Sequence, residues 1–152
     1  AFDVAASAQD AVRAADVVCT VTASREPVLM GEWLRPGAHV NAVGASIATA
    51  RELDTETIRR CRVFVDRRES ALNEAGDLLI PMREGAFSPE GIVAEIGELL
   101  TGTATGRRDD REITLFKSLG IAVEDLASAH HLYERAKQDG AGAWVEFGDT
   151  PA

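Results

Sequence analysis

The residues His39-Val-Asn-Ala-Val-Gly-Ala-Ser46 decide the fold, because a short apolar run is followed directly by a glycine turn. We predict a buried strand over residues 38–43 that ends at Gly44. An earlier run, Val17-Val-Cys-Thr-Val-Thr22, is apolar or β-branched at nearly every position. Strands of this kind are typical of a parallel sheet that helices cover on both faces. The two runs therefore indicate two strands of such a sheet.

The remaining segments alternate between patterns typical of helices and of strands. Ser7, and either Asp54 or Thr55, are expected to cap two of the helices. Residues 90–100 carry apolar side chains at the three- and four-residue spacing of a helix. The alternation predicts an α/β fold with right-handed crossovers. The predicted helices cover residues 8–15, 53–60, 70–74, 90–100 and 120–138, the further strands 62–66, 113–116 and 144–147, and a loop 81–89.

A phosphate-binding glycine loop does not occur in the sequence. Neither G-x-G-x-x-G nor G-x-G-x-x-A is found, although the strands fit the second half of a dinucleotide-binding sheet. The chain also begins at Ala1 rather than at a methionine. We therefore expect a piece of an enzyme. Residues 1–118 would form an incomplete Rossmann-type parallel sheet without its phosphate-loop half, and residues 119–152 a C-terminal helix and strand.

Composition limits the partners and the compartment. The net charge of −9 disfavours nucleic acid and anionic membranes, so we expect neither as a partner. Cys19 and Cys61 lie in apolar, strand-like surroundings, which predicts buried free thiols and a reducing compartment, the cytoplasm. The three histidines lack companion ligands at metal-binding spacing, so we expect no metal site.

Ligands of open parallel sheets bind beyond the carboxyl ends of the strands. In this chain the rule selects residues 20–24, 43–46 and 66–69. The first two stretches offer the hydroxyl groups of Thr20, Thr22 and Ser46, and Gly44 permits close approach of a ligand to the backbone. These groups suit a nicotinamide ribose or ring. An ordinary strand-to-loop turn with a capping serine is the alternative.

Lys117-Ser118-Leu119-Gly120 precedes the longest predicted helix. Amides at a helix start, together with a lysine, can hold an anion or a carboxamide. A capping Ser118 and a solvated Lys117 are the alternative. The mixed charges of residues 107–112 predict a solvated loop. Apolar positions along the helix predict a packing surface, formed by Leu119, Ala122, Leu126, Ala129, Tyr133 and Ala136.

Four segments in order resemble the ornithine cyclodeaminase/mu-crystallin family over about residues 11–133. The resemblance implies a two-domain NAD(P)-dependent enzyme that forms a homodimer. Its N-terminal domain would supply the substrate-binding lysine and arginine, and the C-terminal helix would return to pack on that domain. Both the domain and the residue that selects NAD or NADP lie outside this chain. The segments are Asp16-Val-Val-Cys-Thr-Val-Thr22, Arg35-Pro-Gly-Ala-His-Val-Asn-Ala-Val-Gly-Ala45, Arg51-Glu-Leu-Asp54 and Phe116-Lys-Ser-Leu-Gly-Ile-Ala-Val-Glu-Asp125.

The resemblance also implies roles for single residues in cofactor binding. Thr20 corresponds to a threonine beside the cofactor, and Ser118 to a serine that contacts it. The strand residues Val40, Asn41 and Ala42 correspond to the segment against the nicotinamide side. We therefore expect these five residues, together with Thr22 and Gly44, to bind the cofactor.

One position departs from the cyclodeaminase pattern. Ornithine cyclodeaminases carry an aspartate where this chain has Ser46, and a neutral hydroxyl cannot act as a carboxylate base. Ser46 resembles the ketimine reductase branch, which reduces small imines with NAD(P)H. We therefore predict an imine reductase or amino-acid dehydrogenase, with Ser46 and Lys117 as catalytic candidates and with this chain alone inactive. An ornithine cyclodeaminase and a non-catalytic, small-molecule-binding relative of mu-crystallin remain the alternatives.

Overall fold

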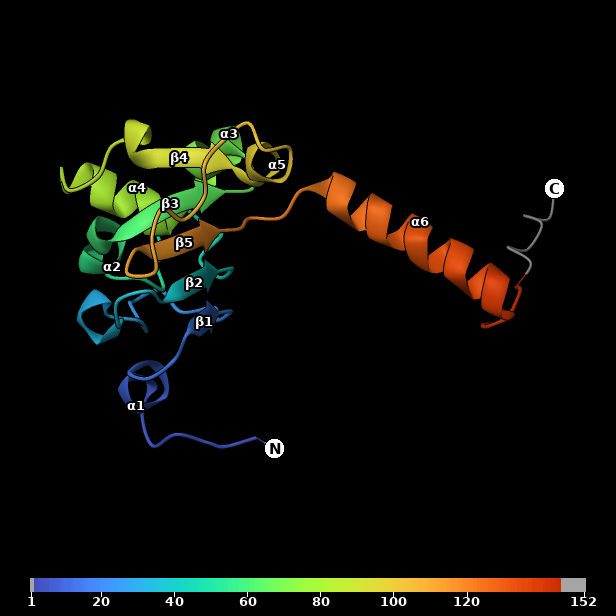
Figure 1. Cartoon of the computed structure of the whole chain (residues 1–152), viewed down its shortest axis with the longest axis horizontal. Helices are drawn as coiled ribbons and strands as arrows, with labels where there is room; N and C mark the ends of the chain where they lie inside the picture. The colour runs from blue at the N-terminus through green and yellow to red at the C-terminus, as the bar shows by residue number, and fades with distance from the viewer. Residues whose placement is uncertain (1, 146–152) are drawn as a thin grey trace. The chain divides into compact units, whose positions relative to one another are not determined.

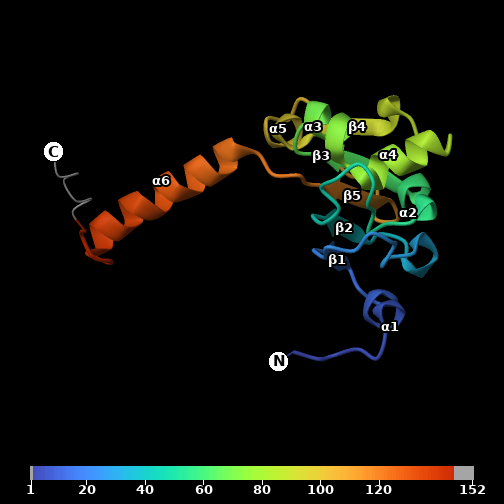
Figure 2. The ribbon, with the colours of Figure 1, turned by 180° about the vertical axis from the view of Figure 1, so that it is seen from behind.

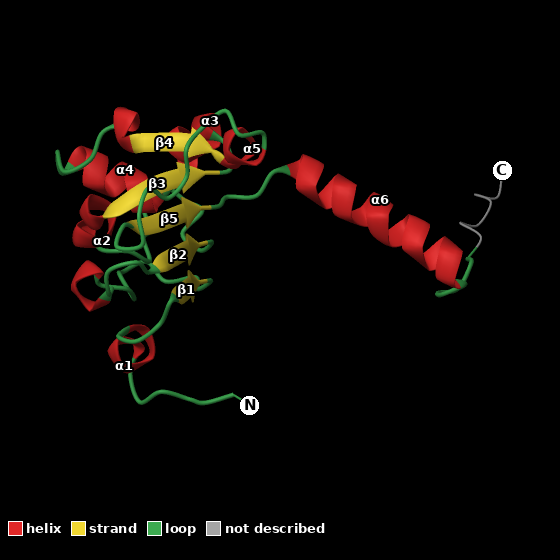
Figure 3. Ribbon diagram, viewed as in Figure 1, coloured by secondary structure: helices red, strands yellow, loops and turns green. Residues whose placement is uncertain are grey.

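A computed structural model describes residues 2–145 and contains a five-stranded sheet in the order β1-β2-β5-β3-β4. All pairings between neighbouring strands are parallel. The arrowheads point to the same edge of the sheet (Figure 3). This arrangement confirms the predicted α/β fold class. The strands are β1 (Val17–Thr20), β2 (His39–Ala42), β3 (Cys61–Val65), β4 (Ile92–Glu95) and β5 (Ile113–Lys117).

Helices follow the strands as crossover connections. A single turn η1 and the helices α2 to α4 lie on one face of the sheet, where they pack against one another (Figures 1 and 2). A short helix α5 lies between β4 and β5 in sequence, and α1 precedes β1. Their bounds are α1 (Ala8–Val12), η1 (Gly31–Trp33), α2 (Thr55–Arg60), α3 (Arg68–Glu74), α4 (Gly76–Arg83), η2 (Pro89–Gly91) and α5 (Ile96–Leu100).

The core lies between the sheet and α2 to α4. The parallel register aligns Val18, Val40, Leu115 and Val63 in one row across four strands. All four side chains are buried, and the last three are completely so. Full burial of an aliphatic side chain stabilises the fold by about 1.5–3 kcal/mol. This row therefore fixes the strand register, and with it the position of the carboxyl ends.

The opposite face of β1 is open, contrary to the prediction that both faces are covered. Residues of β1 alternate between exposed and buried, and Val17 is 57% exposed. Cys19 is also exposed and Cys61 is only partly buried, so the prediction of two buried thiols was wrong. The physical reason is position, because β1 is an edge strand that pairs with β2 alone among the described residues.

Two further assignments were wrong. Residues 90–100 do not form one helix, because Ile92 and Ala94 pair with β3 as strand β4 and point into the core. Only Ile96–Leu100 is helical. The predicted loop begins too early, since α4 continues through Pro81 to Arg83. Gly76 is the first residue of α4, and a Cβ there would collide with the carbonyl groups of residues 47 and 50.

The two predicted helix caps are confirmed. Ser7 Oγ accepts a hydrogen bond from the Asp10 N–H at 3.1 Å. Asp54 Oδ1 accepts one from the Thr57 N–H at 2.8 Å. A side-chain acceptor at the N-cap satisfies an amide that has no partner within the helix. These residues therefore mark the starts of α1 and α2.

The sheet-containing unit ends at Leu119, and a second unit begins at Gly120. The second unit contains α6 (Ala122–Asp139), which ends at Gly140 in the left-handed conformation. Within α6, Leu126 is 70% exposed and Tyr133 49% exposed. The rings of Tyr133 and Trp144 pack edge to face, with their centroids 6.3 Å apart. Trp144 and the following residue are not in a strand, and residues 146–147 of the predicted last strand lie outside the described part of the chain.

No helix within residues 2–145 is both long and apolar enough to cross a membrane.

Candidate functional site

The carboxyl ends of four strands meet at one edge of the sheet, which we call the carboxyl edge. The register pairs Thr20 with Ala42 and Ala42 with Lys117. Lys117 in turn pairs with Val65. Three of the predicted site residues therefore lie on adjacent strands, at the edge where ligands of parallel sheets bind.

Thr20 has a buried hydroxyl group at this edge. Its side chain is 6% exposed, and its Oγ1 has no hydrogen-bond partner within the described residues. Its carbonyl oxygen accepts hydrogen bonds from the N–H groups of Val43 and Gly44, at 2.9 and 3.2 Å. A buried hydroxyl without a partner is uncommon in folded proteins. Thr20 is therefore suited to hydrogen-bond a ligand at the end of β1.

The turn after β2 is tightly packed at Gly44 and open at Ser46. A Cβ at Gly44 would collide with the Thr22 carbonyl and with the Glu52 carboxylate. Ala45 is buried and has a φ of 53°, in the left-handed region. Ser46 is exposed. The turn thus presents a neutral hydroxyl to solvent from a closely packed backbone.

Lys117 is completely buried, so the alternative of a solvated lysine was wrong. Its Nζ lies 3.1 Å from Asp77 Oδ2 and donates a hydrogen bond to the Gly44 carbonyl. Asp77 comes from the first turn of α4, which the sheet orients toward β5. Burial raises the pKa of Asp77, and the nearby Lys117 ammonium opposes that shift. The catalytic role of Lys117 stays a prediction, because its ammonium group has protein partners.

Glu52 extends this buried cluster toward β1. The Glu52 carboxylate accepts a hydrogen bond from the Thr22 N–H, and the side chain is completely buried. The N–H groups of Glu52 and Leu53 both donate to Asp77 Oδ1, at 2.8 and 3.0 Å. Thr22, whose own side chain is exposed, is thereby linked through Glu52 to the Asp77–Lys117 pair.

Ser118 and Asp66 form a second polar contact at the carboxyl edge. Asp66 directly follows β3 and is 2% exposed. Its Oδ2 accepts hydrogen bonds from Ser118 Oγ at 3.3 Å and from the Leu119 N–H at 2.6 Å. The Ser118 N–H donates to the Ala42 carbonyl at 3.0 Å. The Lys-Ser segment is therefore held by two neighbouring strands.

The predicted residues within β2 lie inside the sheet. Val40 and Ala42 are completely buried on the helix-covered face. The Asn41 side chain lies on the other face, with its Oδ1 3.2 Å from His39 Nε2 and its amide near Cys19. Their contact with a cofactor remains a prediction. Their direct effect is to set the position of the turn that follows.

Glu52, Asp66 and Asp77 are site residues that the sequence reasoning did not single out as candidates. Asp66 lies in a stretch selected by the strand-end rule, so its position was available. Glu52 and Asp77 had no such signal, because an acidic residue in a turn or at a helix start is usually solvated. The strand order, which places β5 between β2 and β3, brings Asp77 against Lys117, and the Glu52 backbone N–H in turn bonds Asp77.

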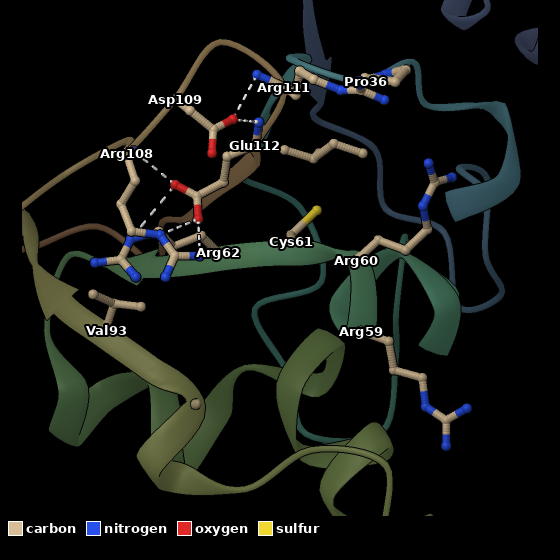
Figure 4. Close-up of a pocket in the computed structure, with 12 residues that line it drawn as sticks. Pro36, Arg59, Arg60, Cys61, Arg62, Val93, Arg108, Asp109, Arg111 and Glu112 are labelled. Atoms are coloured by element: carbon tan, nitrogen blue, oxygen red, sulfur yellow. Dashed lines mark hydrogen bonds and ion pairs between the residues drawn. The ribbon is translucent and has the colours of Figure 1, made fainter.

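A cavity of about 580 Å³ opens at the opposite, amino-terminal edge of the sheet (Figure 4). Arg62 and Arg108 point toward Glu112 there, and Arg62 also donates to two loop carbonyls. Arg107 donates to three carbonyls and to Thr114, so the segment is more firmly held than the predicted solvated loop. This amino edge is far along the strands from the carboxyl edge. Its lining includes Arg59, Arg60, Cys61, Arg62, Arg108, Asp109, Arg111 and Glu112.

Within residues 2–145, no three His, Cys, Asp or Glu side chains lie together in a way that could hold a metal ion.

The sequence model of the ornithine cyclodeaminase/mu-crystallin family matches residues 1–140. The chain belongs to this family. The resemblance inferred from four short segments is therefore confirmed over most of the chain.

Relatives and solved structures give the same assignment. The Delta(1)-pyrroline-2-carboxylate reductase of Bacillus cereus is 45% identical over 91% of this chain, which spans 42% of that protein. The ketimine reductase mu-crystallin of Mus musculus is 48% identical over 86% of this chain, which spans 39% of that protein. A Thermococcus litoralis Delta(1)-pyrroline-2-carboxylate reductase, solved in complex with NADH and L-proline, has a TM-score of 0.86 and 46% identity, and the match covers 91% of this chain and 43% of that one. The chain thus spans less than half the length of these relatives.

Proposed function

We propose that this chain is the C-terminal part of an NAD(P)H-dependent imine or ketimine reductase, or of a related amino-acid dehydrogenase. Ser46 carries the proposal, because it places an exposed neutral hydroxyl where the cyclodeaminase branch is expected to have an aspartate. The identity with a pyrroline-2-carboxylate reductase and with a ketimine reductase supports the same assignment. We further propose that the full-length protein is a cytoplasmic homodimer.

A nicotinamide dinucleotide, NAD or NADP, fits the groups at the carboxyl edge. The buried Thr20 hydroxyl lacks a partner within the described residues, and a ribose or carboxamide group would satisfy it. Ser118 directly follows β5, which is separated from β1 by β2, and offers a second hydroxyl at the same edge. The NADH-bound structure of the Thermococcus litoralis relative supports this choice of cofactor.

When bound, the reduced cofactor supplies a hydride to the C=N carbon, and the nitrogen takes a proton, so that an imine becomes an amine. The residues of this chain would orient the reactants, since correct positioning lowers the barrier of such a transfer. Thr20 would hold the cofactor near its nicotinamide end. Ser46 would hydrogen-bond the substrate without acting as a base, because its hydroxyl stays neutral near pH 7.

The test is NADH and NADPH oxidation by the full-length protein with a panel of cyclic ketimines. We expect rapid loss of the reduced-cofactor absorbance with at least one of them. Absence of turnover across the panel would overturn the reductase assignment. Formation of proline and ammonia from ornithine would instead establish a cyclodeaminase.

A small-molecule-binding role without catalysis, the alternative that the sequence left open, is the second candidate. Tight dinucleotide binding with no turnover of any imine, amine or ornithine would favour it. This chain alone is expected to be inactive in each assay. The Ser46→Ala variant of the full-length protein is the matched control for the role of the hydroxyl.

A further inference from the structure

The turn after β2 holds a residue in an unfavourable backbone conformation. Ala45 has a φ of 53°, and it is the only non-glycine residue with a positive φ within residues 2–145. Its side chain is 7% exposed, so it has little room to rearrange. A left-handed conformation is unfavourable for alanine because its Cβ approaches a carbonyl oxygen. Such a conformation persists only where the surrounding structure imposes it.

The structure that imposes it is the buried charged cluster beneath the turn. The Lys117 ammonium donates to the Gly44 carbonyl, directly before Ala45. The Asp77 Oδ2 atom lies 3.1 Å from the Lys117 Nζ atom, and Asp77 Oδ1 accepts hydrogen bonds from the N–H groups of Glu52 and Leu53. The cluster therefore connects the turn to β5, to α4 and to the segment that follows the turn.

Glu52 closes the cluster on its other side. One carboxylate oxygen accepts the Thr22 N–H from the segment after β1, and the other lies against Gly44. Gly76, next to Asp77, is packed so closely on the Ala50 carbonyl that no side chain fits between them. The turn is thus restrained on both sides, by the exit of β1 and by the start of α4.

Stability alone does not explain this cluster. Three ionisable side chains are completely buried at one place, and apolar residues of similar size would fill the same space without desolvating charges. What apolar residues cannot do is hold a carbonyl and three N–H groups at fixed positions. The arrangement therefore serves geometry at the carboxyl edge.

We propose that Lys117, Asp77 and Glu52 are positioning residues that hold the turn from Gly44 to Ser46 in its strained shape. In that shape the turn faces the reacting end of the cofactor and the imine. Lys117 thus acts through the Gly44 carbonyl rather than by touching the substrate. This inference rests on the proposed reductase function, because that function places the reaction beside the turn.

The first test compares Lys117→Met with Leu78→Ala in the full-length holoenzyme. Leu78 is a completely buried neighbour of Asp77 on α4, so its truncation destabilises the same region without touching the cluster. We expect Lys117→Met to lower kcat for imine reduction by about tenfold or more. The dissociation constant for NADH should change by less than about threefold. Leu78→Ala should change kcat by less than about threefold.

A rescue separates positioning from a loss of folding. Adding Ala45→Gly to Lys117→Met removes the penalty of the left-handed conformation, so the turn can keep its shape without the ammonium. We expect the double variant to regain at least about threefold in kcat over Lys117→Met. No rescue, or an equal loss of kcat in Leu78→Ala, would overturn the proposal. Glu52→Gln replaces Lys117→Met if that variant does not fold, with the same expected loss and rescue.

Hydrogen exchange keeps this inference separate from the proposed function. In the full-length protein, peptides that contain residues 43–46 should exchange about tenfold faster in Lys117→Met than in Leu78→Ala. This readout needs no substrate. If the wild-type protein reduces no imine but residues 43–46 still exchange faster in Lys117→Met than in Leu78→Ala, the positioning role is supported and the reductase assignment fails. Equal exchange in the two variants would overturn the positioning role whatever the activity.

Discussion

Both edges of the sheet carry clusters of ionisable side chains, but the two clusters differ in burial. At the carboxyl edge, Lys117 and Asp77 form an ion pair with both side chains completely buried. At the amino edge, Arg108 pairs with Glu112, and the arginine side chain is 65% exposed. Desolvation makes a broken buried pair costly, whereas water replaces a broken surface pair. Burial, rather than the number of charges, therefore decides which cluster constrains the fold.

Matched amide substitutions at the two edges give the largest expected difference. Asp77→Asn should lower the free energy of unfolding of the full-length protein by about 3–5 kcal/mol, because the new amide NH2 group would face the buried Lys117 ammonium in place of an acceptor oxygen. Glu112→Gln should lower it by about 1 kcal/mol or less, because Arg108 can turn to solvent. Urea unfolding followed by circular dichroism measures both values.

Coupling with Lys117 provides the control for that comparison. Asp77→Asn combined with Lys117→Met should cost less than the sum of the two single substitutions, because the double variant removes both members of the ion pair together. Strict additivity would mean that the two groups do not act as a pair. Equal losses for Asp77→Asn and Glu112→Gln would remove the distinction between the edges.

Glycine substitutions sharpen the same contrast on the backbone. Gly44→Ala should lower the free energy of unfolding by about 1–3 kcal/mol, because the new Cβ meets the Thr22 carbonyl and the Glu52 carboxylate. Gly106, whose carbonyl accepts a hydrogen bond from Arg62, belongs to the amino edge. A Cβ there meets only a Leu99 methyl group at 3.9 Å.

Gly106→Ala is therefore the matched control for Gly44→Ala. It should be neutral or stabilise the protein by about 0.4–1 kcal/mol, since alanine restricts the unfolded chain. Thermal unfolding measures the change in stability of each variant, and the melting temperature of Gly44→Ala should be the lower of the two. A neutral Gly44→Ala would contradict the close packing of the turn.

The sequence was sufficient to predict β1, β2, β3 and β5 as strands, but not β4 or the open face of β1. Continuous apolar runs predicted β2 and β3, because both strands are enclosed by neighbours in the sheet. The segment of β4 has apolar residues at helical spacing, and only pairing with β3 makes it a strand. The open face of β1 depends on its being an edge strand, which no local pattern encodes.

The sequence predicted part of the site at the carboxyl edge. The rule that ligands bind beyond strand ends selected Thr20 and the turn from residue 43 to 46, because the rule needs only the order of strands and turns. The burial of Lys117 was not predictable, since a lysine at the end of a strand is usually solvated. Its partner Asp77 is separated from it by 40 residues in sequence, and Glu52, which bonds Asp77, by 65 residues, so topology alone brings the cluster together.

Acidification should lower the free energy of unfolding by a smaller amount, through Glu112. Burial acts to raise the pKa of Glu112, but hydrogen bonds from the Arg108 N–H and guanidinium outweigh it and hold the pKa below its usual range. The stabilisation from Glu112 is therefore complete above its unfolded-state pKa and is lost as the pH falls through the lowered folded-state pKa. Glu112→Gln should unfold with a shallower acid dependence than wild type.

Asp77 should depend on pH in the opposite direction from Glu112, because burial raises the pKa of Asp77. A carboxyl group with a raised folded-state pKa contributes most at low pH and less as the pH rises through that pKa. Of these two carboxylates, Glu112 and not Asp77 should contribute to the drop in stability on acidification. An unchanged acid profile for Glu112→Gln, measured by urea unfolding between neutral and acid pH, would contradict this assignment.

Thiol reactivity gives the smallest expected effect and tests the depth of the amino-edge cavity. Burial raises the pKa of the Cys61 thiol to about 12, although arginines line the cavity around it. At neutral pH its reactive thiolate is therefore roughly a thousandfold scarcer than that of an ordinary cysteine. In a Cys19→Ser background of the full-length protein, iodoacetamide should leave Cys61 unmodified until denaturant is added, as peptide mass spectrometry would report. Rapid labelling of native Cys61 would mean that water reaches the floor of the cavity, and the amino edge would then be solvated throughout rather than only at its rim.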